Sequence, residues 1–143
     1  MTVTFCGHRQ IDEIQKVRAW LCVVTEHLIE EGAETFYLGG YGAFDEMAAA
    51  VLGEYKQVYP QIQRLLVLAY LDREKTGAKY DNTVYPPLEG VPQRLAIVRR
   101  NRWMVEAADV VVACVDHDWG GAAATLRHAR QKKKRVLVYP SYQ

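Results

Sequence analysis

Several features that would place this chain in a special class of protein are missing. Only three cysteines occur among 143 residues, and no CxxC or Cys/His spacing accompanies them, so neither a disulfide framework nor a zinc site is predicted. No apolar run approaches the ~20 residues that a membrane helix needs. The N-terminus lacks the basic and apolar segments of a signal peptide. We therefore expect a cytoplasmic protein with no membrane association.

An excess of either charge is also missing. The 18 basic and 17 acidic side chains give a net charge of +1. Proteins that bind nucleic acid generally have a strongly basic surface, so this balance argues against nucleic acid as a partner. The basic run at positions 130–135 ends a predicted helix, where cations interact favourably with the negative end of the helix dipole. This position predicts a solvated helix end rather than a nucleic-acid patch.

The residues that are present alternate between short apolar runs and amphipathic segments. Several runs are almost continuously apolar, which is typical of strands covered on both faces in a parallel sheet. Between these runs, apolar residues recur at helical spacing, as in the stripe from Ile11 to Leu28. Gly32 is at a suitable position to end this predicted helix. The predicted strands are Val3–Cys6, Thr35–Leu38, Arg64–Tyr70, Asp109–Val115 and Arg135–Tyr139, and further helices are predicted after Gly42, from Pro92 to about Ala108, and from Gly121 to Lys132.

This alternation predicts a single α/β domain over residues 1–143. We expect a doubly wound, mainly parallel sheet of five strands or slightly more, with helices on both faces. Residues 71–91 do not fit the alternation, because they contain two glycines and two prolines without clear periodicity. We expect an irregular excursion there, and the sequence leaves open whether it is a plain surface loop, a lid or an oligomer contact.

Ligands of a doubly wound sheet bind beyond the C-terminal ends of the strands, so the residues that follow each strand carry the functional signal. After the first strand come Gly7, His8 and Arg9. Glycine permits close approach of a ligand to the backbone, and the forked cation of arginine suits phosphate or carboxylate. His8 suits either a hydrogen bond to phosphate or a structural role.

Two further strand ends lead into helices through glycine-rich turns, which can present free N–H groups to an anion. The first turn contains Gly39, Gly40 and Gly42, and is followed by Asp45 and Glu46. These carboxylates either complement the helix dipole, accept ribose hydroxyls, or stabilise positive charge that develops on a sugar. They are therefore the candidate catalytic residues.

The second turn contains Asp116, Asp118, Trp119, Gly120 and Gly121. The two aspartates suit ribose hydroxyls, whereas a magnesium site needs more oxygen ligands than the sequence supplies, so no metal is predicted. Trp119 would either stack on a base or cover the end of the following helix.

The third predicted helix carries several arginines. Leu95, Val98 and Val105 define its expected inner stripe, which places Arg102 near the buried face and Arg100 outward. A buried arginine must be paired or hydrogen-bonded. Arg102, beside Asn101, is thus either a phosphate clamp or half of an internal salt bridge.

Four motifs together give the chain a family resemblance. They are Phe5-Cys6-Gly7-His8-Arg9, the run from Gly39 to Asp45, the run from Arg100 to Val105 leading into Ala108-Asp109, and Gly120-Gly121 with its alanine-rich helix. In order and spacing they resemble the YpsA-like family of the SLOG superfamily, which includes the DprA proteins and the Lonely guy (LOG) phosphoribohydrolases. The resemblance implies a Rossmann-like sheet, a nucleotide-type ligand at the strand ends and self-association.

The chain departs from the LOG pattern at one informative place. The LOG motif PGGxGTxxE corresponds in chain order to the segment from Gly120 to Arg127, and its glutamate falls at or near Leu126–Arg127, where no carboxylate is present. YpsA-like members also have Gly-Gly-Thr where this chain has Gly-Gly-Ala. Because cleavage of a glycosidic bond requires a carboxylate near the anomeric carbon, the enzyme assignment stays open.

Three functions remain, and the first is preferred. It is capture of a nucleotide or nucleotide-derived ligand, such as NAD or ADP-ribose, by a homo-oligomer (dimer or higher) without a resident cofactor. The second is LOG-like hydrolysis of a nucleoside 5′-monophosphate, and the third is a DprA-like association with nucleic acid. The predicted ligand-binding residues are Gly7, His8, Arg9, Gly39, Gly40, Gly42, Asp45, Asn101, Arg102, Asp116, Gly120 and Gly121.

Overall fold

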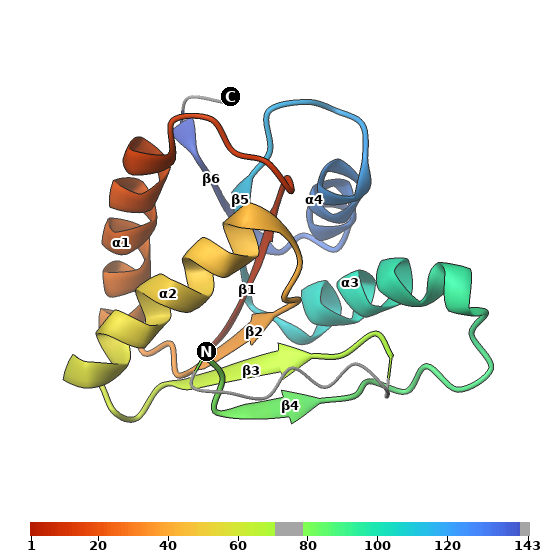
Figure 1. Cartoon of the computed structure of the whole chain (residues 1–143), viewed down its shortest axis with the longest axis horizontal. Coiled ribbons are helices and arrows are strands. Elements are labelled where there is room, and N and C mark those ends of the chain that lie inside the picture. The colour runs from red at the N-terminus through yellow and green to blue at the C-terminus, as the bar shows by residue number, and fades with distance from the viewer. Residues whose placement is uncertain (71–78, 141–143) are drawn as a thin grey trace.

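A computed structural model describes residues 1–70 and 79–140, which form a six-stranded sheet flanked by helices (Figure 1). All adjacent strands pair in parallel, in the order β4-β3-β2-β1-β5-β6. The Rossmann-like α/β architecture predicted from the sequence is confirmed. The strands are β1 (Thr2–Gly7), β2 (Thr35–Leu38), β3 (Gln63–Val67), β4 (Asn82–Val84), β5 (Val110–Cys114) and β6 (Arg135–Val138).

The helices lie on both faces of the sheet and create two hydrophobic cores. On one face, α1 (Ile14–Glu30) and α2 (Gly42–Val58) pack against the sheet, and on the other face lie α3 (Ala96–Ala107) and α4 (Gly121–Gln131) (Figure 1). Residues of β5 alternate between the two cores, so all five are buried. Burial on both faces explains why this strand is continuously apolar in sequence. Within the described residues, no helix combines the length and hydropathy needed to span a membrane.

The strand order reverses between β1 and β5. Successive strands after β1 are added on one side, and β5 and β6 are added on the other, so the two connections that leave β1 and β5 diverge from neighbouring strand ends. The register pairs Gly7 with Cys114, and the next residue, His8, donates its N–H to the Cys114 carbonyl across 3.3 Å. Such a reversal point leaves a crevice outside the sheet, where doubly wound proteins bind their ligands.

Part of the predicted irregular excursion is a strand. β4 pairs with β3, and Asp81 fixes the pairing because its Oδ2 accepts the backbone N–H of Arg64 at 2.7 Å. The expectation of irregular structure over 71–91 is therefore wrong at the three residues of β4. A three-residue strand is too short to give an alternation signal. Positions 71–78 lie outside the described residues.

The predicted helix positions are confirmed with small shifts at their ends. α1 begins at Ile14 rather than Ile11, because Glu13 has a left-handed conformation (φ 53°). Gly32, with φ +110°, lies two residues past the helix end, where only glycine adopts this conformation without strain. The third helix has a short 3₁₀ turn, η1 (Gln93–Leu95), before α3.

Candidate functional site

A cavity of about 740 Å³ opens where β1 and β5 end. It is lined from four directions: by the residues after β1, by the start of α2, by the inner side of α3, and by the loop that leads from β5 into α4. Eight of the predicted site residues line it, namely Gly7, His8, Arg9, Asp45, Asn101, Asp116, Gly120 and Gly121. The other five, Gly39, Gly40, Gly42, Glu46 and Arg102, are not among its lining residues.

Two glycines of the first turn, Gly39 and Gly42, lie in close contact with other parts of the protein. A Cβ on Gly39 would lie 3.2 Å from Cζ of Arg100, and one on Gly42, where φ is +88°, would lie 2.8 Å from Cα of Arg9. Gly7 lines the cavity, but a Cβ there would overlap the side chain of Phe44 at 2.5 Å. This turn therefore brings α2 close to the end of β1, and its glycines do not form an open anion cradle.

Arg100, rather than Arg102, is the buried arginine of α3. Only 2% of Arg100 is exposed, whereas Arg102 is exposed, and Leu95 and Val98 are 40% and 45% exposed. The predicted inner stripe is thus wrong at Leu95 and Val98, whereas Val105 is buried as predicted. The buried stripe follows a spacing of four residues through Ala96, Arg100 and Met104. Arginine can occupy this buried stripe because its N–H groups donate to backbone carbonyls. A pattern of apolar residues cannot predict such hydrogen bonds.

The hydrogen bonds of Arg100 connect three segments of the site. Nη1 donates to the carbonyl oxygens of Gly39 and Val67, each at 2.9 Å, and Nε donates to Oδ1 of Asn101 at 2.9 Å. The guanidinium carbon also lies 5.3 Å from the ring centre of Tyr41. Burial lowers the pKa of Arg100, and the negative charge of Asp45 opposes this effect. An arginine remains charged under such conditions. The buried guanidinium of Arg100 is therefore a permanent positive charge in the wall of the cavity.

The two candidate catalytic carboxylates have different surroundings. Asp45 lines the cavity, and its Oδ2 accepts the backbone N–H of Tyr41 at 3.2 Å. Glu46 is exposed and does not line the cavity. Burial, followed by the charges of Asp45 and Glu46, raises the pKa of the Tyr80 hydroxyl, which places this tyrosine near both carboxylates. Of the pair, only Asp45 is positioned to contact a ligand in the cavity.

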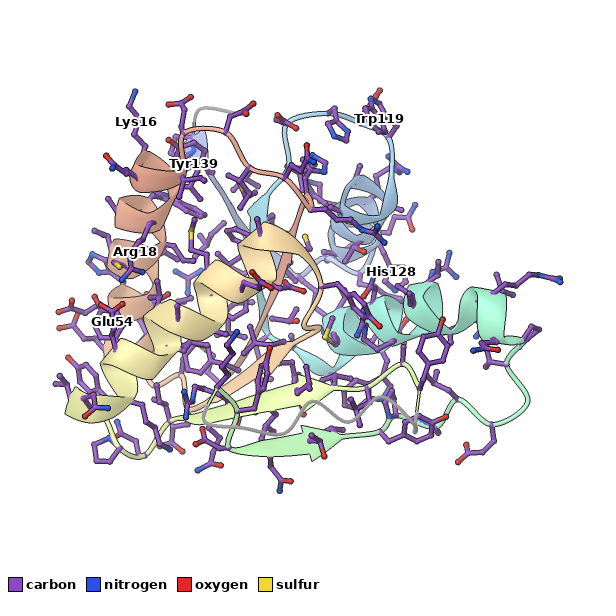
Figure 2. All side chains as sticks on the ribbon, in the orientation of Figure 1. Lys16, Arg18, Glu54, Trp119, His128 and Tyr139 are labelled. Atoms are coloured by element: carbon purple, nitrogen blue, oxygen red, sulfur yellow. The ribbon has the colours of Figure 1, made fainter. Side chains whose placement is uncertain are left out.

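A stack of three aromatic rings stands at the end of β1 and β5. The rings of His8 and His117 are 3.6 Å apart between centroids and 14° from parallel, and those of His117 and Trp119 are 3.8 Å apart and 16° from parallel. His117 is therefore sandwiched between two rings. Trp119 is 68% exposed, and Figure 2 shows it on the loop between β5 and α4, at the outer edge of the molecule.

His8 connects this stack to the β5–α4 loop. The backbone N–H of Asp116 donates to Nε2 of His8 at 3.0 Å, and the same Nε2 lies 2.9 Å from Oδ1 of Asp116. Both contacts cannot be hydrogen bonds at once, since a neutral Nε2 that accepts has no proton to donate. Burial and the nearby His117 lower the pKa of His8, with Asp116 opposing them, so the neutral form is favoured. In the tautomer that carries its proton on Nδ1, Nε2 accepts the N–H of Asp116.

His8, Asp116 and His117 each bring one potential metal-ligating atom to the same place. Their ligand atoms all lie within 4.8 Å of one another, the single such group among residues 1–70 and 79–140. The lone pair of an imidazole nitrogen lies in the ring plane. Because the two rings are stacked nearly parallel, these lone pairs do not converge on one point. The observed geometry suits stacking and hydrogen bonding better than joint coordination of an ion.

Of the two glycine-rich turns, the one that leads into α4 is exposed to solvent, whereas the one that leads into α2 is packed against other residues. Gly120 and Gly121 are exposed, Gly120 has φ +91°, and nothing lies within 4 Å of a Cβ built on Gly121. The N–H groups in the first turn of a helix have no partner within that helix. In α4 no side chain caps them either. Thr125, one turn along, lines the cavity and donates its hydroxyl to the Gly121 carbonyl at 2.8 Å.

Comparison with known proteins agrees with the fold. No family model matches the chain. It is 27% identical over 148 residues to a UPF0398 protein of Halalkalibacterium halodurans, an alignment that covers 93% of this chain and 75% of the relative.

A solved structure of DNA processing protein A from Helicobacter pylori, described for its single-stranded DNA binding mode, superposes with a TM-score of 0.65 at 18% identity. The match covers 96% of this chain but only 64% of that one, so the chain spans less than two thirds of the neighbour's length. At this identity the likeness concerns the fold. The sequence comparison agrees with the resemblance inferred from the four motifs, because the chain is similar over most of its length to a UPF0398 protein. The structural comparison agrees with the predicted Rossmann-like fold.

Proposed function

We propose that the protein binds a nucleotide or nucleotide-derived ligand in the cavity where β1 and β5 end. The observation that carries this proposal is the convergence of a cation, carboxylates, an open glycine turn and an exposed aromatic ring on one cavity at the reversal point of the sheet. Its volume of about 740 Å³ lies within the usual range of small-molecule sites, roughly 300–1,000 Å³.

The groups in the cavity suit different parts of such a ligand. Arg9 is exposed, so its guanidinium is accessible to a phosphate. The open turn at Gly120 and Gly121 offers N–H groups to the same anion. Asp45 and Asp116 accept hydrogen bonds from ribose hydroxyls. Arg100 already donates to two carbonyls, so we give it the role of holding the cavity wall in place.

Thermal denaturation with AMP, NAD and ADP-ribose tests binding, since a ligand that binds the folded state raises the melting temperature. A shift with at least one compound at millimolar concentration is expected. Arg9→Gln should reduce the shift strongly, whereas Arg94→Gln, a matched change at an exposed arginine that does not line the cavity, should leave it intact. Absence of any shift in the native protein contradicts the proposal.

A second candidate is hydrolysis of a nucleoside 5′-monophosphate to base and ribose phosphate. Three carboxylates line the cavity, those of Asp12, Asp45 and Asp116. Asp45 and Asp116, which follow strand ends, are available to stabilise positive charge on the sugar. Glu46 is displaced from this role by its position outside the cavity. Chromatography would detect free base released from AMP. Activity that survives both Asp45→Asn and Asp116→Asn would exclude these carboxylates as catalytic groups.

A third candidate is binding of single-stranded nucleic acid, the property named for the Helicobacter pylori neighbour. The charge balance of the sequence argues against nucleic acid, but three arginines are exposed along η1 and α3, namely Arg94, Arg99 and Arg102. Phosphate contacts would make affinity fall steeply with salt. Fluorescence anisotropy with a labelled oligonucleotide at several salt concentrations distinguishes this function from capture of a small ligand.

We further propose that the protein acts as a homo-oligomer in the cytoplasm. Leu95 and Val98 are exposed apolar side chains on one face of η1 and α3, and a contact between copies would cover them. The free cysteines suit a reducing compartment. Light scattering coupled to size exclusion measures the mass, and Val98→Asp should shift an oligomer towards monomer.

A further inference from the structure

We propose that the outer face of Trp119 is a stacking subsite for a nucleobase, so that the ligand is a base-containing nucleotide and not merely a phosphorylated sugar. This inference rests on the proposed function and specifies its ligand class. It starts from the ring stack of His8, His117 and Trp119, which ends at an exposed indole beside the cavity.

The stack is continuous and has one free end. Centroid separations of 3.6 and 3.8 Å, with planes 14° and 16° from parallel, are those of rings in face-to-face contact. His117 uses both of its faces, on His8 and on Trp119. Trp119 has a ring contact on one side only among the described residues, and 68% of it is exposed. A further planar ring placed on the indole would extend the stack by one member.

The exposure of Trp119 decides between the two roles that the sequence leaves open. A tryptophan that covered the start of α4 would itself be largely buried against the helix. At 68% exposure, the indole leaves most of its apolar surface in water at the edge of the cavity. Burial of that surface by a ligand is favourable, and every nucleobase presents a suitable face.

The platform is held in position before a ligand arrives. The backbone N–H of Asp116, the residue next to His117, donates to Nε2 of His8 and so fixes the start of the loop. Further along, Arg127 donates to the carbonyl of Asp118 at 2.8 Å, which fixes the segment immediately before Trp119. A binding group that is already ordered loses less conformational entropy on association.

The position of the platform also fits the rest of the site. Trp119 immediately precedes the open turn at Gly120 and Gly121, and Arg9 lines the same cavity. A nucleotide can therefore direct its phosphate to the N–H groups and cation within the cavity while its base lies on the indole at the rim. A phosphorylated sugar would use the first set of contacts and leave the indole uncovered.

Isothermal titration calorimetry with AMP and with ribose 5-phosphate tests the inference. Trp119→Ala should weaken AMP binding by about 10- to 100-fold, in line with the usual value of stacking on one aromatic side chain, and leave ribose 5-phosphate unaffected. Trp119→Phe retains a ring and should keep most of the affinity for AMP. Trp103→Phe, at a tryptophan that packs on Tyr37 away from the cavity, is the matched control.

The outcomes separate the subsite from the proposed function. Equal weakening of both compounds by Trp119→Ala, or no weakening of AMP, would overturn the stacking subsite while ligand binding stands. If the native protein binds neither compound nor NAD nor ADP-ribose, both proposals fail. Because Trp119 is exposed, its variants should keep the native circular dichroism spectrum and melting temperature, and AMP should quench indole fluorescence in the native protein but not in Trp119→Phe.

Discussion

The buried guanidinium of Arg100 donates a hydrogen bond to the carbonyl oxygen of Gly39 across 2.9 Å, and so connects α3 to the turn that follows β2. The same nitrogen reaches the carbonyl of Val67 at the end of β3. One side chain thus donates to carbonyl groups at the ends of two strands. This arrangement makes the shape of the cavity wall depend on a single residue.

Replacement of Arg100 should destabilise the fold markedly. Arg100→Met keeps the aliphatic stem but removes the buried donor from both carbonyls and a cation from the surroundings of Asp45, so we expect a loss of about 2–4 kcal/mol in the free energy of unfolding. Urea denaturation measures this loss. Arg99→Met, on the exposed side of the same helix, should change stability by less than ~0.5 kcal/mol. Similar effects for both variants would contradict the assigned role of Arg100.

The two kinds of site glycine should respond oppositely to alanine. In Gly7→Ala the new Cβ would meet Phe44 at 2.5 Å, so we expect destabilisation by about 1–3 kcal/mol. In Gly121→Ala nothing lies within 4 Å of the added Cβ, and restriction of the unfolded chain should stabilise the protein by up to ~1 kcal/mol. Melting temperatures of the two variants provide the comparison, and a stability loss in Gly121→Ala would show that its surroundings are not open.

Stability should depend on pH through His8. Its pKa in the folded state is lowered, so the unfolded chain binds the proton more readily than the native protein does. The stabilising contribution is therefore complete above the ordinary histidine pKa of about 6.5 and declines as pH falls below that value. Urea denaturation from pH 8 to pH 5 should show a smaller decline in His8→Gln than in the native protein. Equal declines would contradict this assignment.

The three cysteines should differ in reactivity. Burial, with smaller contributions from neighbouring negative charge, raises the pKa of Cys6 and of Cys114 to about 12, so neither thiol forms a nucleophilic thiolate at neutral pH. Cys22 is only partly buried. Alkylation of the native protein with iodoacetamide at pH 8, followed by peptide mass spectrometry, should modify Cys22 first. Cys6 lines the cavity but is only 6% exposed, so modification of Cys6 as fast as that of Cys22 would contradict this order.

Helices and strands with a long, regular pattern of apolar residues could be predicted from the sequence. Features that depend on a single contact could not. The continuous apolar run of β5 and the long stripe of α1 identified their elements and the fold class, because burial leaves a periodic record in sequence. β4 has three residues and is fixed by Asp81, which lies before it. No period can reveal a strand of that length.

The candidate site was predicted in part for the same reason. The rule that ligands lie beyond strand ends located seven of its lining residues, and the eighth, Asn101, came from the third predicted helix. It did not distinguish the glycines needed for close packing, Gly39 and Gly42, from those at an open turn. A separate argument, the apolar stripe predicted for α3, placed Arg102 on the inner side of the helix and assigned the buried Arg100 to the outside.

The central position of β1 has a consequence for the order in which the chain can fold. Its partner on one side, β5, lies far along the sequence, and the N–H of Thr2 bonds to Oδ2 of Asp109 across 107 positions. During synthesis β1 can pair with β2 early, but its other edge stays unpaired until β5 has left the ribosome. The crevice between these two strands is therefore among the last parts of the molecule to exist, and a nascent chain that ends before β5 can bind nothing there.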